Sequence, residues 1–195
     1  MDFAEVLKAR HMVRTYRPDP VDDEVLRRIV KVIHRAPSAG FSQGHRLLVI
    51  TDAGLQDRIA DLYDPKYGRV GFPEWVRQAP VLIALCVREE SYHERYRKPD
   101  KINEDGTEIG WPVPYWWFDS GSLLVLLQLA AANEGLATGF FGPHEEGLRE
   151  LLELPDDWGL AGVVTLGYAP EEDGVRRELF RQQRLQLDEL VEWRR

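Results

Sequence analysis

Residues 116–134 limit the fold more than any other stretch, because they place apolar side chains on nearly every side of an expected helix. Gly135 follows the stretch and is expected to end the helix in a left-handed conformation. A helix that is apolar all round is buried all round. The chain has 195 residues, enough for one cored domain. Complete burial of so long a helix in a domain of this size predicts that a second subunit supplies part of its cover.

Shorter helices and strands alternate along the rest of the chain. The near-continuous apolar run at residues 81–87 predicts a strand covered on both faces. Other strands are expected at residues 46–51, 137–141 and 161–168. Helices are expected directly after Asp2 and at residues 22–36, 55–63, 145–152 and, with weaker periodicity, 178–193. The sequence contains no repeat or domain boundary, so we expect one α+β domain over residues 1–195.

Residues 88–114 form a long charged excursion between the buried strand and the apolar helix. Asp105-Gly106 and the pair Pro112 and Pro114 argue against regular structure in this stretch. Long loops in compact domains are often functional. We therefore expect residues 88–114 to act as a lid over a substrate site.

Charge and cysteine content exclude several classes of protein. The formal net charge is −8, which argues against nucleic acid or an anionic membrane surface as the main partner. The longest apolar runs are too short to span a bilayer, and a single cysteine excludes a disulfide framework, so we expect a cytoplasmic protein. Both ends of the chain are mildly basic. These basic residues either bind an anion that lies between the two ends, or they are ordinary solvated surface charges, and both interpretations stay open.

Three short segments are candidates for binding a ligand. Arg10 and Arg14 lie four residues apart and suit a phosphate if a helical turn continues through them, although basic residues are also common at helix ends. Residues 36–43 are small and offer backbone donors to a flat ligand, or simply connect a helix to a strand. Residues 139–143 contain two glycines, which permit close approach to the main chain or serve a turn.

Familiar catalytic patterns are missing from the sequence. It has no G-x-G-x-x-G, no G-K-S/T and no H-E-x-x-H motif, and we expect no metal site. Neither Ser122, which follows Gly121, nor Ser38 lies in a G-x-S-x-G elbow of the serine hydrolase type. Cys86 lies inside an apolar strand and is expected to be a packed thiol. The aromatic residues at 111–118 frame either a pocket or part of the core. Without an acid/base set, an enzyme of this sequence would rely on a bound cofactor for its chemistry.

Taken in order, these segments resemble the FMN-dependent nitroreductase family, and in particular its short nitroreductase-like group. The resemblance is carried by residues 10–14, 36–43, 135–138 and 141–142, and by Arg176-Arg177. It implies a three-layer α+β fold with a mostly antiparallel sheet flanked by helices. It also implies a domain-entwined homodimer with two FMN sites at the subunit interface.

The resemblance also implies roles for individual residues. Arg10 and the pair Arg176 and Arg177 would hold the FMN phosphate, and Arg14 would approach the pyrimidine edge of the flavin, where Lys66 or Arg69 is a further candidate. The Gly142 N–H would point at flavin N5. Met12 replaces a family serine that binds phosphate. Further cofactor contacts are expected from His11, Met12 and Phe141, and, in the other subunit, from Pro37, Ser38, Ala39, Gly40 and Gln43. Phe41, Trp111 and Trp116 would contact the substrate.

The function implied by the resemblance is hydride transfer from NADH or NADPH through flavin N5 to a small aromatic or quinone-like acceptor, with ping-pong kinetics. No side chain would act as a catalytic acid. Two other hypotheses remain open: a flavin-binding store or sensor with little turnover, and a protein-interaction domain without a cofactor.

Overall fold

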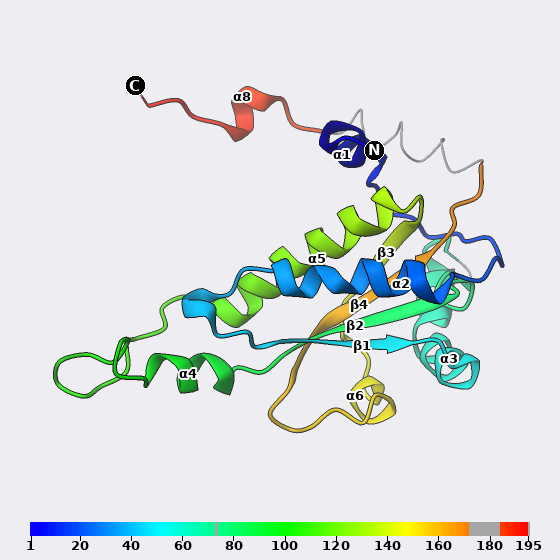
Figure 1. The fold of residues 1–195 in the computed structure, drawn as a ribbon. Helices are drawn as coiled ribbons and strands as arrows, with labels where there is room; N and C mark the ends of the chain where they lie inside the picture. The colour runs from blue at the N-terminus through cyan, green and yellow to red at the C-terminus, as the bar shows by residue number, and fades with distance from the viewer. Residues whose placement is uncertain (73, 172–183, 195) are drawn as a thin grey trace.

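A four-stranded antiparallel sheet forms the centre of the computed structural model, which describes residues 1–72, 74–171 and 184–194. The strands are β1 (His45–Ile50), β2 (Val81–Val87), β3 (Ala137–Phe141) and β4 (Gly159–Gly167), in the order β1-β2-β4-β3 (Figure 1). Each neighbouring pair is antiparallel. This arrangement confirms the expected α+β class, and the four strands lie within two residues of their expected bounds.

The sheet is covered by helices on both faces, which gives three layers. Alternate β2 side chains point to opposite faces. Val81, Ile83 and Leu85 pack with helices α2 (Asp23–Val30) and α5 (Tyr115–Asn133). Leu82, Ala84 and Cys86 pack with helices α3 (Ala53–Arg69) and α6 (Leu148–Leu151). All seven β2 residues are buried, as the apolar run predicts.

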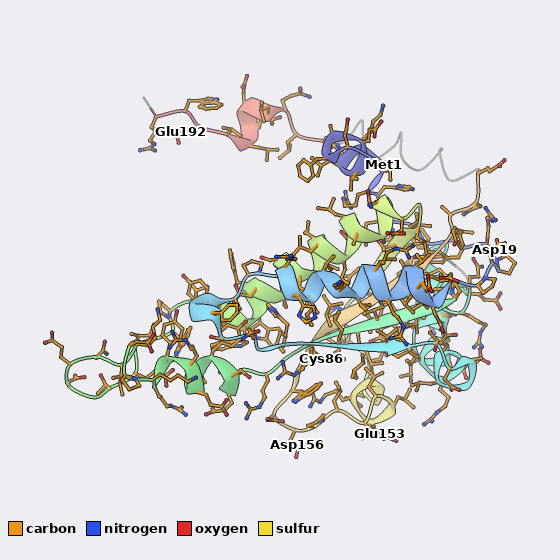
Figure 2. The ribbon with its side chains drawn as sticks, in the orientation of Figure 1. Met1, Asp19, Cys86, Glu153, Asp156 and Glu192 are labelled. Carbon is orange, nitrogen blue, oxygen red and sulfur yellow. The ribbon has the colours of Figure 1, made fainter. Side chains whose placement is uncertain are left out.

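Cys86 is a packed core residue. Only 1% of it is exposed, and it lies at the middle of the molecule (Figure 2). Burial raises the pKa of its thiol to about 11. Because the thiolate is the reactive form, a thiol with this pKa is a weak nucleophile at neutral pH.

Helix ends follow local capping chemistry. Helix α1 (Phe3–Ala9) begins with the capping box of Asp2 and Glu5. Asp22 caps α2, which gives way at Lys31 to the 3-10 helix η1 (Lys31–Arg35), so the single helix expected at 22–36 is in fact two. The short 3-10 helix η2 (Ala39–Phe41) then leads into β1.

Two helices differ in length from the expectation. Helix α3 continues past residue 63 to Arg69 and contains Pro65. Helix α6 begins only at Leu148, not at residue 145, because its N-cap residue Gly147 takes a positive φ of 89°. A left-handed residue at this point prevents the helix from extending toward the end of β3.

Residues 88–114 contain regular structure, so the expectation of an irregular excursion was wrong. Helix α4 (Glu90–Tyr96) occupies part of the stretch. Its Tyr92 is fully buried, and ion pairs join Glu90 to Arg97 and Glu89 to His93. Burial of one aromatic side chain and pairing of the surrounding charges stabilise a turn-rich sequence as a helix.

Helix α5 is only partly covered by its own chain, and cover of the rest by a second subunit stays a prediction. It packs on the sheet through Leu123, Leu127 and Ala131, but Phe118 is 66% exposed and Val125 is 49% exposed. Gly135 takes the expected left-handed φ of 78° just after the helix. Within the described ranges, no helix has both the length and the apolar content needed to span a bilayer.

The C-terminal segment extends away from the sheet in Figure 1. Its only helix within residues 184–194 is α8 (Leu187–Leu190), one turn long, so the helix expected at 178–193 is much reduced over this part. Residues 178–183 of that expected helix lie outside the described residues.

Candidate functional site

A strip of extended chain, residues 10–14, runs along the outer edge of β3. Helix α1 ends at Ala9 and Arg10 is already extended, so the helical turn that would have placed Arg10 and Arg14 on one side does not continue. Met12 forms a parallel bridge with Thr138, and the Val13 N–H donates to the Thr138 carbonyl at 2.9 Å. Alternate residues of an extended chain share one side. Arg10, Met12 and Arg14 therefore still face the same way, with Val13 buried beneath them.

Arg14 lies on an aromatic surface. Its guanidinium carbon is 4.8 Å from the centre of the Phe72 ring and 5.6 Å from that of Trp75, both within cation–π range. Neither Arg10 nor Arg14 pairs with a carboxylate of the described residues. Trp75 is fully buried, and its Nε1 has no hydrogen-bond partner among them. Two guanidinium groups are thus left for an acceptor from outside, whereas the indole N–H is enclosed in the core.

The end of β3 supplies a backbone donor. The Gly142 carbonyl accepts a hydrogen bond from the Tyr63 hydroxyl at 3.0 Å, while no described residue accepts one from the Gly142 N–H. The Tyr63 ring packs on Phe141, with 4.3 Å between ring centres. Burial raises the pKa of Tyr63 to about 12, so its hydroxyl remains a donor at physiological pH. Gly142 is therefore held through its carbonyl and leaves its N–H available.

Lys66 and Arg69 lie near the C-terminal end of α3. The Lys66 ammonium pairs with the Glu145 carboxylate, with N–O distances of 2.5 and 2.6 Å. This ion pair ties α3 to the loop that follows Gly142. Arg69 is exposed, and no ion pair joins it to a described residue. Lys66 is thus engaged by a carboxylate, whereas Arg69 is not.

Residues 37–43 form a loop whose backbone is unusual. Gly40, Phe41 and Gln43 all take positive φ, at 60°, 61° and 52°. Each left-handed residue that is not glycine costs about 1–3 kcal/mol in backbone strain, which surrounding contacts have to offset. The Gln43 N–H donates to the Ser38 hydroxyl at 3.0 Å. Phe41 is 75% exposed, so its ring is free to meet another molecule.

Two other elements hold this loop. The Ala39 N–H donates to the Asp119 carboxylate of α5 at 2.9 Å. The Gly40 carbonyl accepts from Arg95 Nε of α4 at 2.8 Å. A Cβ at Gly40 would lie 2.7 Å from the Tyr96 ring, so only glycine lets the loop approach α4 this closely. The loop is therefore fixed against both helices.

Trp111 and Trp116 belong to an aromatic cluster with Tyr92 and Tyr96 of α4. The centres of the Trp111 and Tyr96 rings are 4.7 Å apart, and Trp111 Nε1 donates to Glu108 at 2.6 Å. Trp116 is 7% exposed and contributes to the core, in line with the packing interpretation of this aromatic run. It also lines a surface depression of about 420 Å³. The cluster holds residues 88–114 against α5, and a substrate role for these tryptophans stays a prediction.

The candidate residues fall into two groups on opposite sides of α5. The loop 37–43 contacts α5 at Asp119, whereas the strip 10–14 contacts it at Gln128, whose Nε2 lies 3.2 Å from Met12 Sδ. Nine residues of helix separate the two contacts by about 13 Å and half a turn. One chain therefore does not bring its own two groups together. Arg176 and Arg177, expected at the phosphate, lie outside the described residues.

Sequence reasoning missed several residues that shape these groups: Asp119, Arg95, Tyr63 and Trp75. Asp119 carries the clearest signal, because it is the only charged residue in the apolar stretch between residues 115 and 133. A lone carboxylate in such a helix is expected to have buried partners. Over the described parts of the chain, no group of histidine, cysteine and acidic side chains has a metal-binding arrangement.

Comparison with known proteins agrees with this geometry. A sequence profile described as the nitroreductase family matches residues 7–168. The chain is 28% identical to a protein from Thermus thermophilus named NADH dehydrogenase, over 100% of this chain and 97% of that protein. It is 26% identical to a protein from Bacillus subtilis named FMN reductase (NAD(P)H), over 90% of this chain and 70% of that protein.

Solved structures share the fold. The nitroreductase family protein of Streptococcus pneumoniae superposes with a TM-score of 0.74 at 23% identity, and the match covers 99% of this chain and 100% of that one. The three-layer arrangement with its antiparallel sheet is thus the fold of that protein as well. On the profile match across most of its length, the chain belongs to the nitroreductase family.

Proposed function

We propose that the protein is an FMN-dependent oxidoreductase that passes a hydride from NADH or NADPH, through flavin N5, to a small aromatic or quinone-like acceptor. Family membership supports this proposal, as do the names of two relatives, NADH dehydrogenase and FMN reductase (NAD(P)H). When bound, FMN supplies the hydride-accepting ring, so no side chain of this chain has to act as an acid or base.

One observation carries the proposal: Arg10 and Arg14 lie on one side of the strip 10–14 without a described carboxylate partner, beside the available Gly142 N–H. Guanidinium groups bind phosphate and other anions well. Arg10 would hold the phosphate together with Arg176 and Arg177. Arg14 would stabilise negative charge at the pyrimidine edge of the reduced ring, and the Gly142 N–H would donate near N5.

A second copy of the chain completes the site in this proposal. The loop 37–43 and the strip 10–14 contact opposite sides of α5, so a flat ligand clasped by both groups requires one group from each of two subunits. The exposed apolar side chains of α5, Phe118 and Val125, supply a surface for that partner. Residues 88–114, with Trp111, would border the acceptor side of the flavin.

The visible spectrum of the purified protein tests the proposal. We expect a yellow dimer that binds one FMN per subunit and is bleached by NADPH or NADH without air, followed by many turnovers on a nitroaromatic or a quinone. Rapid bleaching without turnover would instead indicate the flavin store or sensor. A colourless protein that takes up no added FMN would refute the proposed function.

Substitution of Arg14 tests whether the arginines of the strip 10–14 bind FMN. The Arg14→Ala variant loses a charge-assisted contact worth about 1.5–3 kcal/mol, so we expect FMN to bind about tenfold to a hundredfold more weakly. Arg58→Ala is the matched control, because Arg58 is an exposed arginine on α3 that forms no ion pair with a described residue. Equal FMN affinity in the two variants would argue against the assigned site.

A further inference from the structure

Asp119 is a buried carboxylate that joins two separate segments. Only 5% of it is exposed. Its Oδ2 atom accepts a hydrogen bond from the Ala39 N–H at 2.9 Å and another from the Tyr92 hydroxyl at 3.0 Å. Ala39 belongs to the loop 37–43, and Tyr92 belongs to α4. One oxygen atom of α5 is therefore shared by the loop and by the helix of residues 88–114.

The groups around Asp119 leave these two donors as its main compensation. Burial, and then the charge of Asp119, raise the pKa of Tyr92, so the hydroxyl stays protonated and donates. His45 is also buried, its Nε2 has no hydrogen-bond partner among the described residues, and burial lowers its pKa. His45 is therefore neutral at physiological pH and does not act as a cation against Asp119. A buried carboxylate depends on such hydrogen bonds.

The loop depends on this contact in turn. Phe41 and Gln43 hold left-handed conformations that isolated residues avoid. Among the described residues, three hydrogen bonds reach the loop from other elements: the Ala39 bond to Asp119, the Gly40 bond to Arg95, and a bond from Arg46 Nη1 of β1 to the Gln43 carbonyl at 3.0 Å. Gly44 approaches Tyr92 so closely that a Cβ would lie 2.5 Å from its ring, which continues the contact with α4. Without the hydrogen bond to Asp119, the loop 37–43 would spend part of its time in conformations that relieve the backbone strain at Phe41 and Gln43.

We propose that Asp119 is a positioning residue for the flavin. It holds the loop 37–43 in the conformation that contacts FMN bound to the partner subunit, and it couples this loop to α4, so that the loop and the acceptor-side lid move as one unit. Asp119 itself does not touch the cofactor. This inference rests on the proposed function, and it adds a residue that acts on the flavin through the backbone of Ala39.

Three variants test the positioning role by equilibrium titration with FMN. Asp119→Ala removes both hydrogen bonds and lowers the fraction of loops in the binding conformation, so we expect Kd to rise about tenfold to a hundredfold. Asp119→Asn keeps an amide oxygen for Ala39 and should restore Kd to within about fivefold of the wild type. Tyr92→Phe removes one hydrogen bond and should raise the KM for the acceptor with little change in the KM for NADPH. Thermal unfolding of each apo variant separates these effects from loss of fold.

Mixed dimers distinguish positioning from a general structural role. Asp119→Ala and Arg14→Ala chains carry different tags and are co-expressed, and the mixed dimer is purified on both tags. One site of this dimer combines an intact loop with an intact Arg14, so we expect it to bind one FMN with the wild-type spectrum. If Asp119 only supported its own subunit, the strip 10–14 of that subunit would fail as well, and the mixed dimer would bind none.

The outcomes separate this inference from the proposed function. A wild-type protein that binds no FMN overturns both. A wild-type protein that binds FMN, together with an Asp119→Ala variant of unchanged Kd, overturns only the role of Asp119. If Asp119→Ala does not fold, Tyr92→Phe carries the test, and identical acceptor KM values for Tyr92→Phe and the wild type would then refute the coupling of loop and lid.

Discussion

A methyl group added at Gly139 tests how closely the strip 10–14 is packed on the sheet. A Cβ at this β3 position would overlap the Trp75 ring and would lie 2.5 Å from both Thr165 Oγ1 and the Val13 carbonyl oxygen. The Val13 oxygen belongs to the backbone of the strip and is unable to rotate away. Overpacking a core costs about 1–3 kcal/mol, and three simultaneous overlaps place Gly139→Ala at about 3 kcal/mol.

Thermal unfolding of the apo protein measures this cost. For a domain of this length, each kcal/mol shifts Tm by about 2–4 °C, so Gly139→Ala should unfold about 6–12 °C below the wild type. It should also bind FMN more weakly, because the strip carries Arg10 and Arg14. Gly110→Ala is the control: a Cβ there meets no atom within 4 Å, and we expect a change within about 0.5 kcal/mol. If Gly139→Ala melted within about 2 °C of the wild type, the close packing of the strip would be refuted.

Two further predictions concern single side chains. Met12→Ser restores a hydroxyl at the expected phosphate position, worth about 1 kcal/mol, so a fluorescence titration should give an FMN Kd about fivefold lower; an unchanged Kd would contradict the placement of the phosphate beside Met12. Burial lowers the pKa of His45 from its usual 6.5, so its contribution to stability is complete above pH 6.5 and is lost as the pH falls toward the lowered folded-state pKa. Between pH 7.5 and 5.5, the free energy of unfolding in urea should therefore fall less for His45→Gln than for the wild type. Equal falls in the two proteins would disprove the lowered pKa of His45.

Much of the fold was predictable because its main elements are set by local patterns. β2 and β3 agree with the expected ranges, since a short apolar run bounded by turn residues defines a buried strand. Helix α4 was missed because its stability comes from the burial of Tyr92 and from ion pairs that only the folded chain assembles. The late start of α6 depends on the left-handed Gly147, and the sequence shows the glycine but not its φ.

The candidate site was predictable in its parts and not in its assembly. Residues 10–14, 36–43 and 142 were proposed from composition and from their order along the chain, and their contact with a cofactor stays a prediction. Their separation onto two sides of α5 is a tertiary property that no local pattern contains. Asp119 was missed because a charged residue in an apolar helix reveals burial but not which segments it will join.

The strip that carries Arg10 and Arg14 also closes the free edge of β3. An open strand edge offers unpaired N–H and C=O groups to other chains and promotes aggregation. Met12 and Val13 occupy that edge through their contacts with Thr138. Detachment of residues 10–14 from β3 would therefore move the two arginines away from the site and expose the unpaired edge of the sheet. We expect the protein without FMN to aggregate sooner on storage than the protein with FMN bound.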